Sequence, residues 1–171
     1  MPAMPARAAP PPPERVRELP LLHELTVPRE YEDANGHMSI AHHMGIHDAA
    51  GMPFFATLGI DESYFSERRL GIMDLEHHLV YLAEVHVGDV VGVHSRVLER
   101  SDKAAHGIWF LLNRTRDRLA NTLEWVSLHV DLDLRRAAPF PAEVASALDR
   151  QIEQSRALDW EPPVCGVMGL R

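Results

Sequence analysis

The sequence predicts an α+β fold in which an antiparallel sheet of about five strands curves around one long, buried helix. Two observations support this prediction. Residues 39–58 carry apolar side chains at helical spacing, with small residues on the other side. From Leu70 onwards the apolar residues alternate with a period of two, in four runs that turn residues separate.

The expected helix begins after Ser39, a residue type that caps helix starts well. Its apolar stripe consists of Ile40, Met44, His47, Gly51, Phe54 and Leu58. The opposite side is small rather than polar, at Ala41, Gly45, Ala49 and Ala50. Each internal glycine costs about 1 kcal/mol of helix propensity relative to alanine, so packing must hold this helix. Pro53 lacks an amide proton, and we expect the helix to kink or restart there.

The remaining elements follow in order along the chain. We expect a first strand at Leu21–Tyr31, interrupted by Pro28, and a short helical turn within the loop 59–69. The four alternating runs are 70–87, 90–100, 104–114 and 119–134, and an amphipathic helix follows at 142–158. Residues 1–19 are a Pro-rich lead that we expect to be disordered, 20–158 form a single domain, and 159–171 form a tail. A single curved sheet leaves an edge strand uncovered, which favours dimers.

Composition excludes several classes of function. The formal net charge of −8 argues against nonspecific nucleic-acid binding, which needs a basic face. No apolar run reaches the ~20 residues of a membrane span. The Pro- and Ala-rich start does not resemble a secretory signal, and Cys165 is the only cysteine. A cytoplasmic protein without structural disulfides is therefore expected.

The segment before the central helix combines a carboxylate with a helix start. Asp33 precedes Gly36–Ile40, whose amides would carry the positive end of the helix dipole. Such amides can stabilise an oxygen that becomes negative during acyl transfer. A carboxylate beside them can attack an acyl group or deprotonate a water molecule. Asp-x-Asn-Gly is also good turn chemistry, so Asp33 could serve only as a turn cap.

Several blocks in this order resemble a known family. They are Asp33-x-Asn35-Gly36-His37-Met38, His78-x-x-Tyr81-Leu82-x-Glu84, Gly88-Asp89, Asp102-Lys103, Thr122-x-Glu124 and His129-Val130-Asp131. Together they resemble the acyl-CoA thioesterases of the hot-dog superfamily over residues from about 25 to 145, and most of all the branch with betainyl-CoA thioesterases. The resemblance implies hydrolysis of an acyl-CoA thioester by a homodimer or a dimer of dimers. It implies no cofactor, because coenzyme A is part of the substrate, and no nucleic-acid or membrane partner.

Residue roles follow from the same resemblance. Asp33 takes the position of the family's catalytic carboxylate, and the amides around Gly36 and His37 take the carbonyl-polarising role. The expected substrate-binding residues are Asn35, Met38, Ser39, His42, His43, Asp48, His78 and Glu84. Ser39 replaces the usual asparagine, and His42 and His43 replace tyrosines, so the acyl group remains unidentified.

Some residues allow two interpretations. His37 either lines the site or fixes its loop, and Asp48 either reaches across a dimer interface as a second carboxylate or orients a histidine. His43 and His47 lie four apart, yet no His-Glu-x-x-His pattern accompanies them, so no metal site is predicted. Glu124 should belong to a buried polar network.

Two other functions remain open for such a chain. The first is a hydratase or dehydratase of enoyl or hydroxyacyl thioesters. Relatives of that type prefer Asp-x-Asn-Pro-x-His, whereas this chain has Gly36 in place of the proline. The second is a protein that binds acyl-CoA without catalysis.

Overall fold

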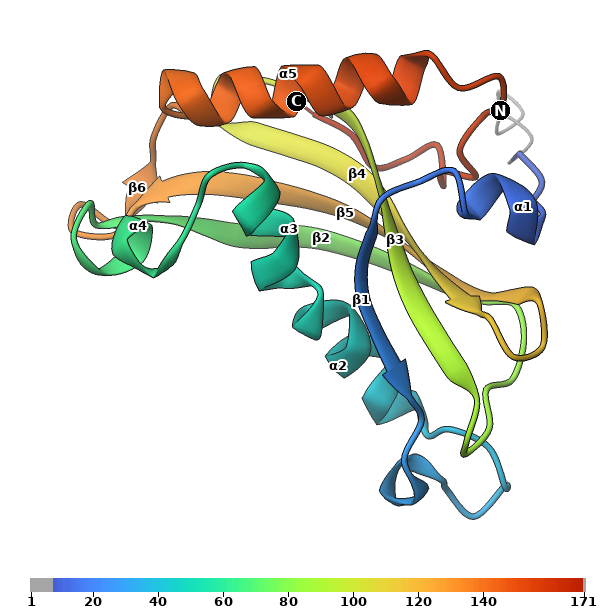
Figure 1. The fold of residues 1–171 in the computed structure, drawn as a ribbon. Helices are drawn as coiled ribbons and strands as arrows, with labels where there is room; N and C mark the ends of the chain where they lie inside the picture. Colours follow the sequence, from blue (N-terminus) through green and yellow to red (C-terminus); the bar gives the residue numbers. More distant parts are fainter. Residues whose placement is uncertain (1–7, 171) are drawn as a thin grey trace, which may run out of the picture.

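The computed structural model describes residues 8–170, which form an antiparallel sheet curved around a helical layer (Figure 1). The strand order is β1-β3-β4-β5-β2, and a short β6 pairs with β5. The strands are β1 Leu21–Thr26, β2 Leu70–Tyr81, β3 Val90–Arg100, β4 Ala104–Asn113, β5 Arg118–Asp131 and β6 Arg136–Ala137. The helices are α1 Pro13–Val16, η1 Arg29–Tyr31, α2 Ile40–Ala49, α3 Gly51–Thr57, α4 Glu62–Ser66 and α5 Ala142–Arg156. The predicted curved sheet around a central helix is confirmed.

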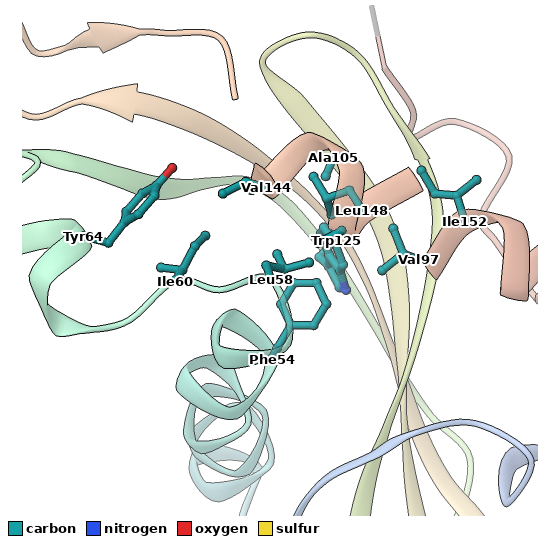
Figure 2. Packing of buried hydrophobic residues seen from close by; sticks show 11 residues of the cluster. Phe54, Leu58, Ile60, Tyr64, Val97, Ala105, Trp125, Val144, Leu148 and Ile152 are labelled. Carbon is teal, nitrogen blue, oxygen red and sulfur yellow. The ribbon is translucent and has the colours of Figure 1, made fainter. Parts of the chain in front are cut away.

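Alternation along β4 separates the two faces of the sheet. Trp109 packs with the clusters that include α2 and α3, whereas Ile108 and Phe110 pack with Val16 of α1. The cluster between α3, α5 and the sheet is drawn in Figure 2. The central helices and α5 therefore cover one face, while α1 and residues 158–160 cover the other.

The central helix is broken, as Pro53 predicts. Segment α2 ends at Ala49 and α3 begins at Gly51, because the proline ring would clash with the carbonyl of residue 49 and offers no amide. Ser39 caps α2 as expected, and its Oγ accepts a hydrogen bond from the Ala41 amide at 3.4 Å.

The predicted buried stripe on α2 is wrong at its first two positions. Ile40 is 69% exposed and Met44 is 37% exposed, whereas His43, Ile46 and His47 face the sheet. The edge strand β2 also exposes Met73 and Leu75. Ile40 and Met44 thus leave apolar surface exposed on α2, whereas Met73 lies on the opposite sheet face, because its neighbour Ile72 packs toward the helices.

Three predicted boundaries change. The lead predicted to be disordered is ordered from Pro13, because Val16 and Leu19 are buried against β4; residues 1–7 lie outside the described residues. The first strand ends at Thr26, before Pro28 starts a 3₁₀ turn. Strand β2 ends at Tyr81, and residues 82–89 leave the sheet toward the start of α2. A helical turn, α4, occupies the loop as predicted.

No helix among residues 8–170 has both the length and the apolar composition that crossing a membrane requires.

Candidate active site

A tight turn holds Asp33 in place just before α2. The Asp33 Oδ1 accepts a hydrogen bond from the Asn35 amide at 2.8 Å, and the Asp33 carbonyl accepts one from the Gly36 amide at 3.1 Å. Gly36 has φ +79°, a conformation that residues with a Cβ adopt at a cost. The turn closes when the Asp33 amide donates to the His37 carbonyl at 3.0 Å. The capping and catalytic interpretations of Asp33 are thus compatible, because one turn fixes the orientation of the carboxylate.

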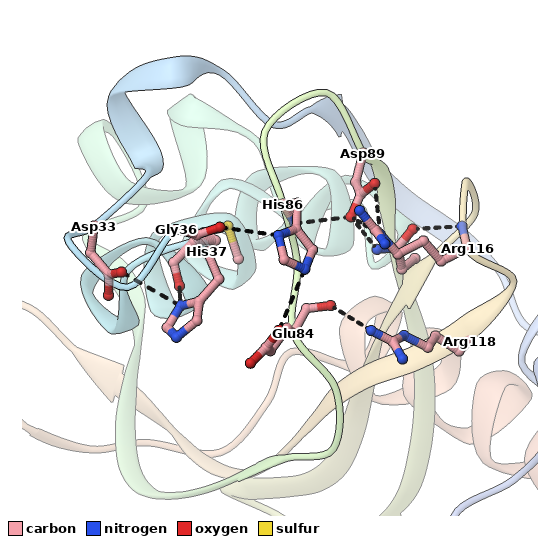
Figure 3. Close-up of polar contacts among 10 residues, drawn as sticks. Asp33, Gly36, His37, Glu84, His86, Asp89, Arg116 and Arg118 are labelled. Atoms are coloured by element: carbon pink, nitrogen blue, oxygen red, sulfur yellow. Dashed lines mark hydrogen bonds and ion pairs between the residues drawn. The ribbon is translucent and has the colours of Figure 1, made fainter.

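The segment 82–89 anchors this turn to the sheet (Figure 3). The Met38 amide donates to the Val85 carbonyl at 2.7 Å, and His86 Nδ1 lies 3.1 Å from the Gly36 carbonyl oxygen. Asp89 holds His86 by accepting a hydrogen bond from its amide at 2.9 Å. Sequence reasoning did not place His86 in the site, although it lies only two positions after Glu84.

Hydrogen bonds also fix His37 beside the carboxylate. Its Nδ1 lies 3.3 Å from the Met38 carbonyl oxygen and 3.7 Å from Asp33 Oδ1. Because Nδ1 must donate to the carbonyl, the other ring nitrogen, Nε2, is left for a ligand. His37 therefore both fixes the loop and lines the site, which unites the two interpretations.

Free amides at the start of α2 are fewer than expected. The Gly36 amide donates to Asp33, and the Ser39 amide donates to the Tyr31 carbonyl at 2.8 Å. Within 36–40, a fully described segment, the amides of His37 and Ile40 have no hydrogen-bond acceptor. The turn itself therefore engages the Gly36 amide, which was predicted to take an oxyanion role.

A cavity of about 390 Å³ lies next to His37, between α2 and the segment that follows β2. Its wall includes Ile40, His43, Tyr81 and Glu84. The cavity thus lies between the start of α2 and residues 81–85, and Asp33 is not part of its wall.

Asn121 in β5 connects two buried histidines of α2. Its Oδ1 can only accept, so His47 Nε2 donates to it at 2.7 Å. Its Nδ2 can only donate, so His43 Nδ1 accepts from it at 2.9 Å. A neutral His43 consequently carries its proton on Nε2, and this residue lines the cavity.

Burial keeps both histidines neutral. It lowers the pKa of His43 to about 4, with further lowering by the charges of His37 and His42. Burial likewise lowers the pKa of His47 to about 4, although the hydrogen bond with Asn121 by itself would raise this pKa. Sequence reasoning missed Asn121, although an amide inside an apolar strand is a signal for such a network.

Residues 27–148 match the family profile described as the thioesterase-like superfamily. The chain belongs to this superfamily. It is 31% identical to the betainyl-CoA thioesterase of Pseudomonas aeruginosa over 148 residues, which cover 86% of this chain and 93% of that protein. It is 30% identical to an L-carnitine dehydrogenase/betainyl-CoA thioesterase of Agrobacterium fabrum, over 75% of this chain and 26% of that protein.

Solved structures agree with the thioesterase fold. A putative thioesterase from Pseudomonas putida aligns with a TM-score of 0.72 at 26% identity, over 90% of this chain and 96% of that one. A Staphylococcus aureus protein in complex with CoA aligns with a TM-score of 0.78 at 23% identity, over 90% of this chain and 97% of that one. The predicted hot-dog fold and the predicted enzyme class, a thioesterase, are both confirmed.

Other predicted substrate-binding residues also have structural partners, and Met38 lines the smaller cavity as well. Met38 is 2% exposed and belongs to the core, and Ser39 caps α2. The His42 ring stacks on Tyr31 with a centroid distance of 3.8 Å. The tight turn therefore explains Asn35, and packing explains Met38 and His42.

Asp48 lines a second, larger cavity of about 580 Å³ under α2 and α3. The wall of this cavity also includes Asp74, Phe54, Trp109 and Trp125. Asp48 is exposed, and no contact with a histidine is found for it among residues 8–170. The structure thus gives no support to the prediction that Asp48 orients a histidine.

Glu84 and His78 occupy separate regions of the thioesterase. The Glu84 carboxylate is 64% exposed, lines the smaller cavity and lies 3.5 Å from His86 Nε2. His78 is on the opposite face of the sheet, where its Nδ1 lies 3.9 Å from Glu124 Oε2. The structure thus places the predicted substrate-binding residue His78 apart from the Asp33 turn, because strand alternation directs its side chain away from α2.

Glu124 is part of a buried polar network, as predicted. Its Oε1 lies 3.0 Å from His106 Nε2, and its Oε2 accepts a hydrogen bond from the Cys165 amide at 2.7 Å. Burial by itself would raise the Glu124 pKa, but the hydrogen bonds from His106 and Cys165 outweigh it and lower the pKa.

Proposed function

We propose that the protein hydrolyses acyl-CoA thioesters, with Asp33 as the catalytic carboxylate. The observation that carries this proposal is the turn at 33–37. It holds the carboxylate with Oδ1 3.7 Å from His37 Nδ1, and the free amides of His37 and Ile40 follow it directly along the chain. The thioesterase superfamily and the betainyl-CoA thioesterase relative support the reaction class.

In the hydrolytic step, Asp33 removes a proton from a water molecule while the water oxygen attacks the thioester carbonyl carbon. The amides of His37 and Ile40 donate hydrogen bonds to the resulting oxyanion. Collapse of this intermediate breaks the C–S bond, and the thiolate of coenzyme A leaves and takes up a proton. A positioned base contributes about 10²–10⁴-fold, and each oxyanion donor contributes about 2.7–4 kcal/mol.

His43 supplies a further hydrogen bond within this proposal. Its Nε2 proton faces the smaller cavity because Asn121 and His47 fix the other side of the ring. A tyrosine hydroxyl, the residue type expected here, can both donate and accept, whereas the neutral His43 Nε2 can only donate. We assign it to a carbonyl oxygen of the substrate.

The larger cavity favours an acyl group with a cationic head. Aromatic rings from Phe54, Trp109 and Trp125 surround a space that also contains the carboxylates of Asp48 and Asp74. Aromatic faces and carboxylates both attract a quaternary ammonium group, and neither lysine nor arginine lines the wall. Phe54, Trp109 and Trp125 can thus form an aromatic cage, although His42 and His43 stand where tyrosines are usual.

A homodimer completes the proposal. The edge strand β2 and the exposed Ile40 and Met44 of α2 form the apolar surface for a second copy. Within this dimer we keep the sequence-based alternative that Asp48 reaches across the interface as a second carboxylate. We also keep the sequence-based prediction of a cytoplasmic location, which the lone cysteine supports.

A thiol-release assay tests both the reaction and the acyl group. Betainyl-CoA and 3,3-dimethylbutyryl-CoA have the same shape and differ by one charge, because carbon replaces nitrogen in the latter. We expect release of coenzyme A from both and a higher kcat/KM for betainyl-CoA. Equal kcat/KM values for the two substrates would overturn the preference for a cationic acyl group but not the proposed hydrolysis. Loss of the conjugated double bond of an enoyl-CoA without thiol release would favour a hydratase, and binding without any turnover would favour a non-catalytic protein.

A further inference from the structure

We propose that His78, Glu124 and Cys165 bind a divalent transition-metal ion, with Zn²⁺ as the best match, on the sheet face opposite to α2. This metal-binding cluster joins three parts of the chain, namely β2, β5 and the segment after α5. It shares no residue with the Asp33 turn or with either cavity. The proposal is therefore independent of the proposed function.

The donor atoms are close enough to share one ion. One donor from each residue, a ring nitrogen, a carboxylate oxygen and the thiol sulfur, all lie within 4.8 Å of one another. His78 Nδ1 and Glu124 Oε2 are 3.9 Å apart. Tetrahedral zinc, with bonds of about 2.0–2.3 Å, holds its ligand atoms roughly 3.3–3.8 Å apart. Small side-chain rotations would therefore convert the observed arrangement into a coordination shell.

Glu124 is held as a metal-binding carboxylate is usually held. Its side chain is 1% exposed, and its Oε1 lies 3.0 Å from His106 Nε2. His106 Nδ1 in turn lies 3.1 Å from Glu99 Oε1. Outer partners of this kind fix the orientation of metal ligands. The Oε2 accepts one hydrogen bond, from the Cys165 amide, and an oxygen with two lone pairs can also coordinate an ion.

The segment after α5 delivers the cysteine to this position. The same hydrogen bond that satisfies Glu124 brings the Cys165 side chain to the carboxylate. The Cys165 Sγ accepts one weak hydrogen bond, from the Met168 amide at 3.4 Å. Cys165 is half-buried rather than fully enclosed.

The donor set selects the class of ion. A thiolate and an imidazole favour Zn²⁺ over Mg²⁺ or Ca²⁺, which prefer oxygen ligands. The His78 side chain is 41% exposed, so solvent can supply a water molecule as fourth ligand. Binding would release the thiol proton, because the thiolate is the ligand. The consequence is a metal clip that ties the chain's last described segment to β2 and β5.

Cobalt substitution tests the clip directly. The protein, free of any affinity tag and stripped of metal by a chelator, is titrated with Co²⁺ and its absorption spectrum is recorded. We expect one equivalent to produce a thiolate-to-cobalt charge-transfer band in the near ultraviolet, which one equivalent of Zn²⁺ removes. A wild-type protein without this band would overturn the proposal.

Two variants assign the ligands. Cys165→Ser keeps the amide that bonds to Glu124, so the fold is retained, and we expect the charge-transfer band to disappear. His78→Gln should weaken Co²⁺ binding at least about tenfold, by analogy with losses on changing metal-site partners. His23→Gln, on the far edge strand β1, is the control and should bind Co²⁺ like the wild type. Persistence of the charge-transfer band in Cys165→Ser would refute the site. Release of coenzyme A by Cys165→Ser should equal that of the wild type, because the cluster lies apart from both cavities.

Discussion

His47 of α2 donates its Nε2 proton to Asn121 Oδ1 of β5 at 2.7 Å, across the interface between the central helix and the sheet. The other side of the same amide donates to His43. One amide thus decides which nitrogen of each imidazole carries a proton.

The first prediction concerns Asn121→Asp, which should move the His43 proton from Nε2 to Nδ1. A carboxylate accepts only, so the neutral His43 must place its proton on Nδ1 and offer a lone pair to the cavity. The lost hydrogen bond to the substrate is worth about 0.5–1.5 kcal/mol, so kcat/KM for thiol release should fall about 2- to 13-fold. Nitrogen NMR of the imidazoles should report the tautomer change.

His43→Phe is the matched control for that change, because it removes the donor and keeps a ring. The fall in kcat/KM for His43→Phe should be similar to that for Asn121→Asp. The double variant should show no larger fall than either single variant. Additive losses would separate Asn121 from His43 and contradict the assigned role.

The second prediction concerns stability in acid. The folded-state pKa of His43 and of His47 is about 4, compared with an ordinary 6.5 in the unfolded chain. The unfolded chain therefore binds more protons in this range, and the free energy of unfolding should fall as the pH drops from about 6.5 to about 4. A shift of roughly 2.5 pKa units at 1.36 kcal/mol each gives about 3 kcal/mol per histidine.

Urea unfolding at a series of pH values measures this loss. Removing one of these groups with His43→Phe should make the loss of unfolding free energy smaller by about 3 kcal/mol. If the free energy of unfolding of His43→Phe depends on pH as strongly as that of the wild type, the pKa of His43 is the same in the folded and the unfolded protein.

The third prediction compares two glycines. Gly36→Ala forces a Cβ into φ +79°, which should cost about 1–2 kcal/mol and loosen the turn that holds Asp33. Gly45→Ala lies within α2, where a Cβ has no neighbour within 4 Å, and should stabilise by about 0.5–1 kcal/mol. Thermal unfolding of both variants checks the opposite signs. Equal effects would show that the turn conformation is not strained by a side chain.

The order of elements could be predicted because local patterns determine it. Period-two alternation gave β3 as Val90–Arg100, and the missing amide of Pro53 gave the break between α2 and α3. The orientation of α2 could not be predicted, since its small and apolar residues make both sides similar. Ile40 and Met44 therefore lie on the open side although the sequence suggested a buried stripe.

Only the part of the site that lies within one continuous segment of the chain could be predicted from the sequence. Asp33 and His37 share a turn, so their proximity follows from the sequence. Asn121 and His86 come from strands and loops that only the folded sheet brings near α2. His78 was misplaced because a strand residue can face either side, and β2 has a register irregularity between Asp74 and Glu76.

The last prediction tests the carboxylate itself with Asp33→Asn. Asparagine keeps an Oδ1 that can accept from the Asn35 amide, so the turn and the free energy of unfolding should be preserved. It cannot take a proton from water, and kcat for thiol release should fall at least about a hundredfold. The control is Asp61→Asn, because Asp61 makes the same kind of turn at the start of α4, away from both cavities. Both variants remove one charge from an equivalent turn, so a fall in kcat that is confined to Asp33→Asn reports the chemical role of the carboxylate. Near wild-type turnover in Asp33→Asn would exclude Asp33 as base or nucleophile.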